Sequence, residues 1–323
     1  MGKHLFKIAD WQVTVSFADE SGANGMHLLP SYQPFRIGED EALPQLLSME
    51  VDDSLRPVRK SERTRIRVFD TGNGDTVVDR LSDGGYQYII RDIFSADCAL
   101  LICDATFSRC RCALNGTAVM RRFGLNNALM LAYAFASARH DTLLIHASLV
   151  RHRGKAYAFT AKSGTGKSTQ VANWLRMIPG CDLMNDDNPI VRVFPGKRAV
   201  IYGSPWSGKT PCYRQTSAPL AAVTQIDRAA ANSIERLPPL QAFGFLLASC
   251  SAMKWEKTLF SNICDTVTAV VETVPIYVLH CTADPLSAVV CHNVIAAEKA
   301  SHPNPQPYEA TEPEAQTETP SKT

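Results

Sequence analysis

The stretch KAYAFTAKSGTGKST, residues 155–169, decides how the middle of the chain folds. Its first seven residues are mostly apolar and predict a buried strand. The eight residues 161–168 match the Walker A pattern G-x-x-x-x-G-K-[ST], except that Ala161 replaces the first glycine. Gly164 and Gly166 lack a β-carbon, so the backbone N–H groups around them can turn inward about a phosphate chain. The stretch therefore predicts a strand followed by a phosphate-binding loop.

The residues after this loop predict an amphipathic helix over 167–177, whose positive N-terminal end would add to the attraction for phosphate. Lys167 would neutralise the β- and γ-phosphates, and the Ser168 hydroxyl could bind Mg²⁺. The expected cofactors are therefore ATP and Mg²⁺. The expected nucleotide contacts are seven consecutive residues: Ser163, Gly164, Thr165, Gly166, Lys167, Ser168 and Thr169.

Two adjacent carboxylates, Asp186 and Asp187, follow the loop in the segment CDLMNDDNPIV. Neighbouring side chains of an extended strand point to opposite faces, so one aspartate could reach a metal while the other points elsewhere. Two roles are available: a Mg²⁺ ligand, and a base that takes a proton from an acceptor hydroxyl. The alternative is an Asx turn that ends at Pro189.

Two further side chains are candidates for chemistry. His146, in LLIHASLV, is either a core histidine or a group that faces the phosphates. Lys209 lies in GSPWSGKT, residues 203–210, whose glycines and proline predict a loop that could bring a cation to a transferred phosphoryl group. The alternative for this loop is a surface turn with Trp206 packed on the core.

The rest of the chain divides by its patterning. Residues 1–120 predict short strands and a β-rich region that could recognise an acceptor, whereas residues 121–300 alternate strands and helices and predict an α/β domain. A helix is expected from Arg122, with a buried stripe formed by Leu125, Leu129, Ala132, Tyr133 and Ala136. Residues 301–323 hold five prolines and predict a disordered tail. The expected strands are 11–17, 66–69, 86–90, 143–150, 155–161, 190–194, 199–202, 220–226 and 276–281, and the expected later helices are 240–249, 255–271 and 286–300.

Composition excludes several classes of protein. The 323 residues, at about 150 per domain, indicate about two domains, and 45% hydrophobic with 20% charged residues is typical of a globular chain. A net charge of +1 gives no overall field for nucleic acid, and the basic run 56–67 is expected to be a solvated loop or strand face. No apolar stretch is long enough to cross a membrane, and no signal peptide is recognisable, so a cytoplasmic location is expected. The ten dispersed cysteines are expected to be reduced core thiols.

These motifs together resemble a known family. His146, the loop AKSGTGKST, the pair Asp186 and Asp187, and GSPWSGK are similar to the HPr kinase/phosphorylase-related group of the phosphoenolpyruvate carboxykinase superfamily. Residues 219–249 also look like the downstream segment of HPr-kinase-like proteins from peptide-modification gene neighbourhoods. The resemblance covers about residues 122–297.

The resemblance implies an α/β fold in which a P-loop, carboxykinase-like nucleotide-binding domain follows the β-rich region. It implies a kinase with ATP on the loop, Mg²⁺ held by Ser168 and one aspartate, the other aspartate as base, and His146 near the phosphates. The acceptor would be a serine-type hydroxyl of a peptide, protein or small molecule, and a homo-oligomer is plausible. GSPWSGK replaces the family's glutamate-arginine-glycine signature, so neither the phosphorylase reaction nor HPr as acceptor is predicted.

Three other functions compete with a kinase. Residues 224–227, TQID, fit a loose guanine-reading motif, but no D-x-x-G follows the glycine-rich loop, as a GTPase switch would require. A non-catalytic nucleotide-binding or peptide-binding module would lack a catalytic group, whereas the sequence keeps Lys167, Ser168 and both aspartates. Carboxykinase chemistry would need a cluster of histidine, lysine and arginine ligands that the sequence does not reveal. Which arginine would assist transfer is open among Arg192, Arg214 and Arg236.

Overall fold

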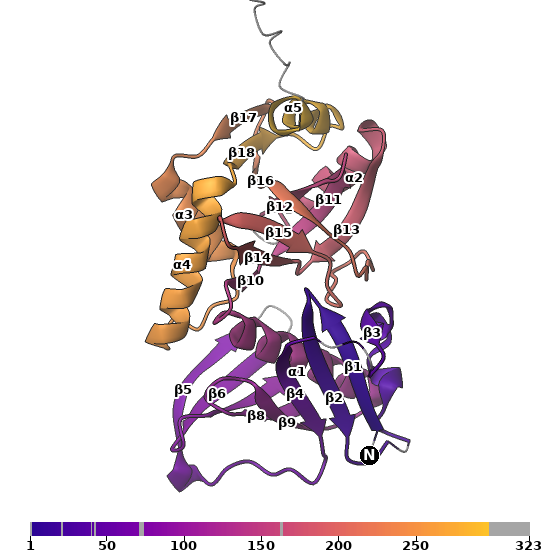
Figure 1. Cartoon of the computed structure of the whole chain (residues 1–323), viewed down its shortest axis with the longest axis vertical. Helices are drawn as coiled ribbons and strands as arrows, with labels where there is room; N and C mark the ends of the chain where they lie inside the picture. The colour runs from indigo at the N-terminus through magenta and orange to yellow at the C-terminus, as the bar shows by residue number, and fades with distance from the viewer. Residues whose placement is uncertain are drawn as a thin grey trace, which may run out of the picture.

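The protein is a mixed α/β structure with a β-rich N-terminal sheet and a second, curled sheet that carries helices (Figure 1). The computed structural model describes residues 2–20, 22–39, 41, 43–70, 74–161 and 164–296. The predicted tail 301–323 and Ser163 lie outside these residues. Within the described residues, no helix is long and apolar enough to cross a membrane.

The first sheet holds nine strands in the order β3-β1-β2-β4-β9-β8-β7-β6-β5 among the described residues. Alternation along its strands buries one set of side chains, as Val13, Val15 and Phe17 of β2 illustrate. The strands are β1 (Gly2–Ile8), β2 (Trp11–Phe17), β3 (Arg36–Ile37), β4 (Gln45–Val51), β5 (Arg63–Asp70), β6 (Asp75–Leu81), β7 (Tyr86–Arg91), β8 (Asp97–Cys103) and β9 (Arg109–Leu114). Three short 3-10 helices interrupt them: η1 (Met26–Leu28), η2 (Pro30–Phe35) and η3 (Lys60–Glu62).

The basic run 56–67 forms η3 and the start of β5, at the edge of this sheet. Arg63 and Arg65 form ion pairs with the buried carboxylate of Asp79. Burial raises the pKa of Asp79, but the hydrogen bonds from Arg65 and Arg63 outweigh it and hold this pKa below its usual range. Part of the basic run therefore neutralises a buried acid on the neighbouring strand.

Helix α1 (Ala118–Ser137) covers the first sheet and also contacts the second one (Figure 1). Thr117 caps its N-terminus, because the Thr117 hydroxyl accepts a hydrogen bond from Met120 N. The helix therefore begins four residues earlier than expected. The predicted stripe is confirmed, since all its members are buried: Leu125, Leu129, Ala132, Tyr133 and Ala136.

The second sheet contains β10-β14-β15-β16-β12-β11-β13, with β18 beside β16 and β17 beside β18, within the described residues. The long strand β16 (Ser217–Arg228) joins its two parts, because its start pairs antiparallel with β15 and its later residues pair parallel with β12 and β18. The remaining strands are β10 (Thr142–Leu144), β11 (Ala147–His152), β12 (Lys155–Thr160), β13 (Cys181–Asp187), β14 (Ile190–Phe194), β15 (Arg198–Tyr202), β17 (Ser233–Arg236) and β18 (Ile276–Cys281).

Helices cover both faces of this second sheet. On β12, Tyr157 and Phe159 pack with one pair of helices, whereas Ala156 and Ala158 belong to the core on the other face. A strand that is buried on both faces has a continuous run of apolar residues, and the segment KAYAFT predicts this strand for that reason. The first pair is α2 (Lys167–Met177) with α5 (Leu286–Ile295), and the second is α3 (Pro239–Ser249) with α4 (Lys257–Thr273).

Most of the expected elements are confirmed, and one is wrong. The strand expected over 143–150 is two strands, β10 and β11, separated at Ile145 and His146. A segment distant in sequence causes the break: Ile145 pairs with Cys250, and His146 N donates a hydrogen bond to Ser249 O. His146 therefore lies between two strands.

All ten cysteines fall within the described residues and are free.

Candidate functional site

The glycine-rich loop (residues 161–169) joins β12 to α2, as the sequence predicts. Gly164 and Gly166 have φ angles of 76° and 129°, values that residues with a β-carbon rarely adopt. Within the described residues, no side chain caps the first turn of α2, and the N–H groups of a helix start point toward the preceding loop. The local geometry is that of an anion-binding helix start.

Arg228, at the end of β16, holds the described part of this loop. Its Nε donates to Thr165 O at 3.0 Å, and its Nη2 donates to Gly164 O at 2.5 Å. Because these carbonyls are bound to Arg228, the arginine fixes the backbone of the loop at Gly164 and Thr165. The sequence offers no local signal for this residue, which is 64 positions from Gly164.

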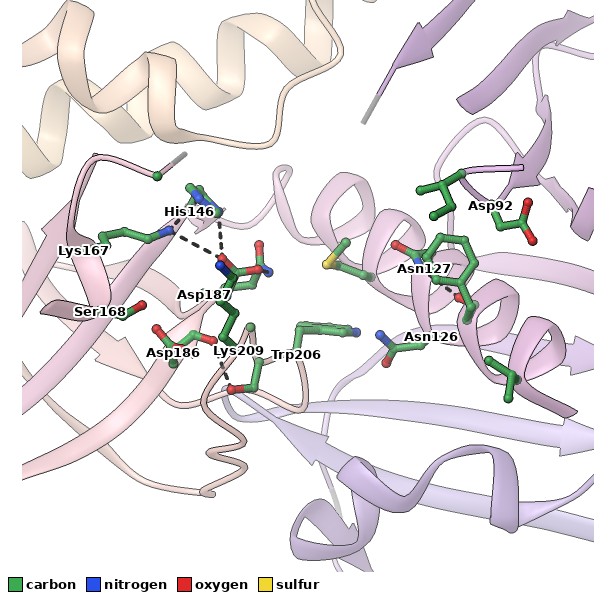
Figure 2. Close-up of a pocket in the computed structure, with 18 of the residues that line it drawn as sticks. Asp92, Asn126, Asn127, His146, Lys167, Ser168, Asp186, Asp187, Trp206 and Lys209 are labelled. Carbon is green, nitrogen blue, oxygen red and sulfur yellow. Dashed lines mark hydrogen bonds and ion pairs between the residues drawn. The ribbon is translucent and has the colours of Figure 1, made fainter. Parts of the chain in front are cut away.

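Lys167, His146 and Asp187 form a triangle of polar contacts (Figure 2). Lys167 Nζ lies 2.5 Å from His146 Nε2 and 3.5 Å from Asp187 Oδ1. His146 Nδ1 lies 3.1 Å from the same Oδ1 atom. These contacts fit a lysine ammonium that donates to both partners and a neutral histidine that donates from Nδ1 to the carboxylate.

Burial changes the acidity of both bases in this triangle. Burial, followed by the neighbouring Lys167 ammonium, lowers the pKa of His146. Burial also lowers the pKa of Lys167, although Asp187 opposes that shift. A cation and an imidazole held together beside one carboxylate in a cleft are typical of a functional site.

Asp186 also lines the cleft, but it is almost fully buried and has other hydrogen-bond partners. Its Oδ1 accepts from the Ser148 hydroxyl at 2.6 Å, and its Oδ2 accepts from Thr210 N at 3.0 Å. Asp187 ends the strand with a φ of 124°, a strained value for a residue with a β-carbon. The two neighbouring aspartates therefore have different partners, as expected of adjacent strand residues.

The loop over residues 203–210 lies against the end of β13. Asn185 holds it, because its Nδ2 lies within 3.4 Å of oxygens of Ser204, Trp206 and Cys212. The turn before Pro189 also depends on Asn185, whose Oδ1 accepts from Asn188 N at 3.2 Å. Within the described residues, neither aspartate forms the Asx turn that the sequence left open, and the side chain that binds this turn is that of Asn185, three residues before Asn188.

The sequence-predicted residues meet in one cleft of about 1120 Å³ between the two sheets (Figure 2). Trp206 packs against Tyr133 and lines the cleft where the two sheets meet. Lys209 is exposed and also lines it. The cleft gathers nine of the predicted residues: His146, Gly164, Gly166, Lys167, Ser168, Thr169, Asp186, Asp187 and Lys209. Thr165, the remaining described residue of the predicted set, does not line it.

Sequence reasoning missed the opposite side of this cleft. The turn between β7 and β8 and one face of α1 supply apolar and amide side chains there, with Phe94 and Asn126 among them. Exposed apolar residues in a turn carry no motif, and only the packing of α1 between the sheets brings them to the site.

The candidate arginines and the guanine-reading motif have other surroundings. Arg214 donates to Asp182, and Arg192 donates to Ala9 O and stacks on Trp11. Residues 224–227 lie inside β16 between β12 and β18, so they form no base-reading loop. The observation weakens the GTPase alternative.

The geometry predicts lower stability in mild acid. Burial lowers the pKa of His140, His146 and His152 below the ordinary value of about 6.5. As the pH falls below 6.5, the unfolded chain binds more protons at these sites than the folded chain, so the free energy of unfolding decreases. We expect a lower urea midpoint at pH 5.5 than at pH 7.5, and a smaller difference in His152→Gln. An equal or higher midpoint at pH 5.5 would contradict the prediction.

Donor atoms for a metal are few. Among the described residues, no group of three or more histidine, cysteine, aspartate or glutamate side chains could hold a metal ion. Ser168 and Asp186 both line the cleft, and the Ser168 hydroxyl has no hydrogen-bond partner in the described part of the chain. Any ion held here would therefore take most of its ligands from a bound molecule or water.

The chain matches no family model, and no curated protein is significantly similar to it.

Proposed function

We propose that the protein is an HPr-kinase-like P-loop kinase that moves the γ-phosphoryl group of ATP to a hydroxyl of a peptide, protein or small molecule. The observation that carries the proposal is the triangle of Lys167, His146 and Asp187 beside a glycine-rich loop in one cleft. Phosphoryl transfer needs a cation at the phosphates and a carboxylate near the attacking hydroxyl. The triangle supplies both.

In this proposal the loop and the start of α2 bind the phosphate chain. Backbone N–H groups near Gly164 and Gly166 would donate to phosphate oxygens, and Lys167 would leave Asp187 to pair with the β- and γ-phosphates. Lys209, which has no polar partner among the described residues, could reach the transferred group from the facing loop. The two lysines would offset the charge of the phosphates.

The residues present fit a bound Mg²⁺. Two of the about four lone-pair positions of the Asp186 carboxylate accept hydrogen bonds from Ser148 and Thr210, which leaves positions for an ion. Mg²⁺ in such sites is held by one or two side-chain oxygens, with phosphates and water completing the shell. Ser168 and Asp186 would hold it, and when bound it would neutralise charge on the β- and γ-phosphates.

Asp187 is the proposed base, because its carboxylate faces the cleft beside His146 whereas Asp186 is buried. The acceptor hydroxyl would give its proton to Asp187 as its oxygen bonds to the γ-phosphorus. The bond from that phosphorus to the β–γ bridging oxygen would break, and ADP would leave. His146 would orient the carboxylate through its Nδ1–H.

The direct test is incubation of the purified chain with γ-labelled ATP and Mg²⁺, alone and with free serine or lysate peptides. Label in an acceptor, absent with Lys167→Ala, would establish a kinase. ATP binding without transfer to any fraction would instead indicate a nucleotide-binding module.

Arg228 gives a prediction about nucleotide affinity. Arg228→Ala removes two hydrogen bonds to loop carbonyls, and we expect ATP to bind roughly three- to tenfold more weakly by titration calorimetry. Arg236→Ala is the matched control, since Arg236 is an exposed arginine on β17 that does not line the cleft. Equal affinities for Arg228→Ala and the unmodified chain would contradict the role of Arg228.

A further inference from the structure

The cleft has a second wall that phosphate chemistry does not use. Opposite the triangle, the turn between β7 and β8 presents Ile93 and Phe94, and α1 presents Val119, Phe123 and Met130. In Figure 2 the labelled residues of this wall lie across the cleft from Lys167. One wall is charged and the other is mostly apolar, so the cleft suits an occupant with two unlike parts.

Three residues of this wall are unusually exposed for their type. Phe94, Val119 and Ile93 are 82%, 78% and 67% exposed. The turn that carries two of them is well fixed, because Asp92 Oδ1 accepts from Phe94 N at 2.9 Å and from Ala96 N at 3.0 Å. A fixed turn that holds a phenylalanine in solvent, next to further apolar side chains, marks a contact surface.

The cleft is large enough for more than one bound molecule. Its volume of about 1120 Å³ exceeds the range of about 300–1000 Å³ that is usual for a pocket with one drug-sized ligand. An acceptor as small and polar as free serine would leave the apolar wall in water. The wall is therefore best covered by an acceptor that extends from the triangle to Phe94.

The polar groups of the wall suit a polypeptide. Asn126 lines the cleft, and its amide has no hydrogen-bond partner among the described residues, so it can both donate to and accept from a peptide backbone. Asn127 donates to Phe123 O at 2.8 Å, which leaves its own oxygen as an acceptor. The wall carries one charged side chain in the described residues, Asp92, so it has little attraction for an anionic ligand.

We propose that the acceptor is a polypeptide segment in which a large apolar residue flanks the hydroxyl-bearing residue and packs on Ile93, Phe94 and Val119. This inference rests on the proposed kinase function and names its substrate class. The neighbouring Asn126 would bind the segment's backbone, while the hydroxyl would lie beside Asp187.

The test separates docking from catalysis. Linear peptides with a fixed central serine and randomised flanks are selected on the intact chain with Mg²⁺ and a non-hydrolysable ATP analogue. The affinity of the enriched peptides is then measured by fluorescence anisotropy for the unmodified chain and for Phe94→Asp. Leu240→Asp is the matched control, because Leu240 is 84% exposed but does not line the cleft.

We expect enrichment of phenylalanine, leucine, isoleucine or methionine beside the serine, and binding about tenfold weaker in Phe94→Asp but unchanged in Leu240→Asp. No apolar preference, or equal binding by Phe94→Asp, would overturn the inference. A selective loss of ATP affinity in Phe94→Asp would also overturn it, because the wall would then bind the nucleotide base. A chain that is a dimer unless it carries Phe94→Asp would overturn it as well, because the wall would then be a contact between two copies. Selected peptides that bind but receive no label from γ-labelled ATP would contradict the kinase proposal and leave the docking surface standing.

Discussion

Replacing Lys167 with alanine is expected to abolish measurable phosphoryl transfer, with a loss of about 10²- to 10³-fold or more. Lys167 Nζ contacts both His146 and Asp187, so the substitution removes the cation from the centre of the site. The proposed ground-state and transition-state contacts to the β- and γ-phosphates would disappear together. Label transfer from γ-labelled ATP measures the loss of phosphoryl transfer, and titration calorimetry measures the weaker binding of the nucleotide.

Two controls make the Lys167 result specific. Lys197→Ala removes an exposed lysine that pairs with Glu272 far from the loop, and it should transfer label normally. Because the Lys167 ammonium helps to lower the pKa of His146, Lys167→Ala should also raise that pKa, which NMR titration of the His146 ring can follow. Normal turnover by Lys167→Ala would remove the basis of the kinase proposal.

The sequence predicted the parts of this site that depend on short-range pattern. The apolar run before Ala161 and the glycines at 164 and 166 specify a strand and a turn through backbone geometry alone, and the structure has both. The stripe from Leu125 to Ala136 likewise needs only helical periodicity. Such features are local, because each residue's conformation is decided by its near neighbours.

Contacts between distant segments could not be predicted in this way. His146 leaves its strand because Ser249 O and Cys250 compete for the backbone there, and no pattern near residue 146 reports that competition. The buried aspartate, Asp186, has its hydrogen-bond partner Ser148 38 residues away, and no pattern near residue 186 reports that partner. The apolar wall of the cleft also depends on tertiary packing, because Phe94 reaches the cleft only through the arrangement of the two sheets around α1.

Asp187→Asn is expected to leave ATP affinity within a few-fold of the unmodified chain but to lower label transfer by about 10²- to 10⁴-fold. An asparagine fills nearly the same space and can still accept from His146 Nδ1 with its oxygen. The Asn188 amide, which donates to Asp187 Oδ2, would turn to present its oxygen to the new amide, so the cleft should keep its shape. It cannot take the proton of an acceptor hydroxyl. Binding and transfer should therefore separate in this variant, whereas both are lost in Lys167→Ala.

Asp186→Asn is the matched comparison, since it makes the same chemical change one residue away. Asp186 accepts from both the Ser148 hydroxyl and Thr210 N, and an asparagine amide can accept at only one of its two atoms. The new NH₂ group would then face a donor, either Thr210 N or the Ser148 hydroxyl, and only the hydroxyl can turn to accept. Asp186→Asn should therefore lower the unfolding midpoint and loosen the loop over residues 203–210. Asp187→Asn should change its midpoint less, because Asp187 is less buried and the Asn188 amide that donates to its Oδ2 can turn. If Asp187→Asn transferred label normally while Asp186→Asn stayed folded but inactive, the base would be Asp186, and the roles proposed for the pair would be reversed.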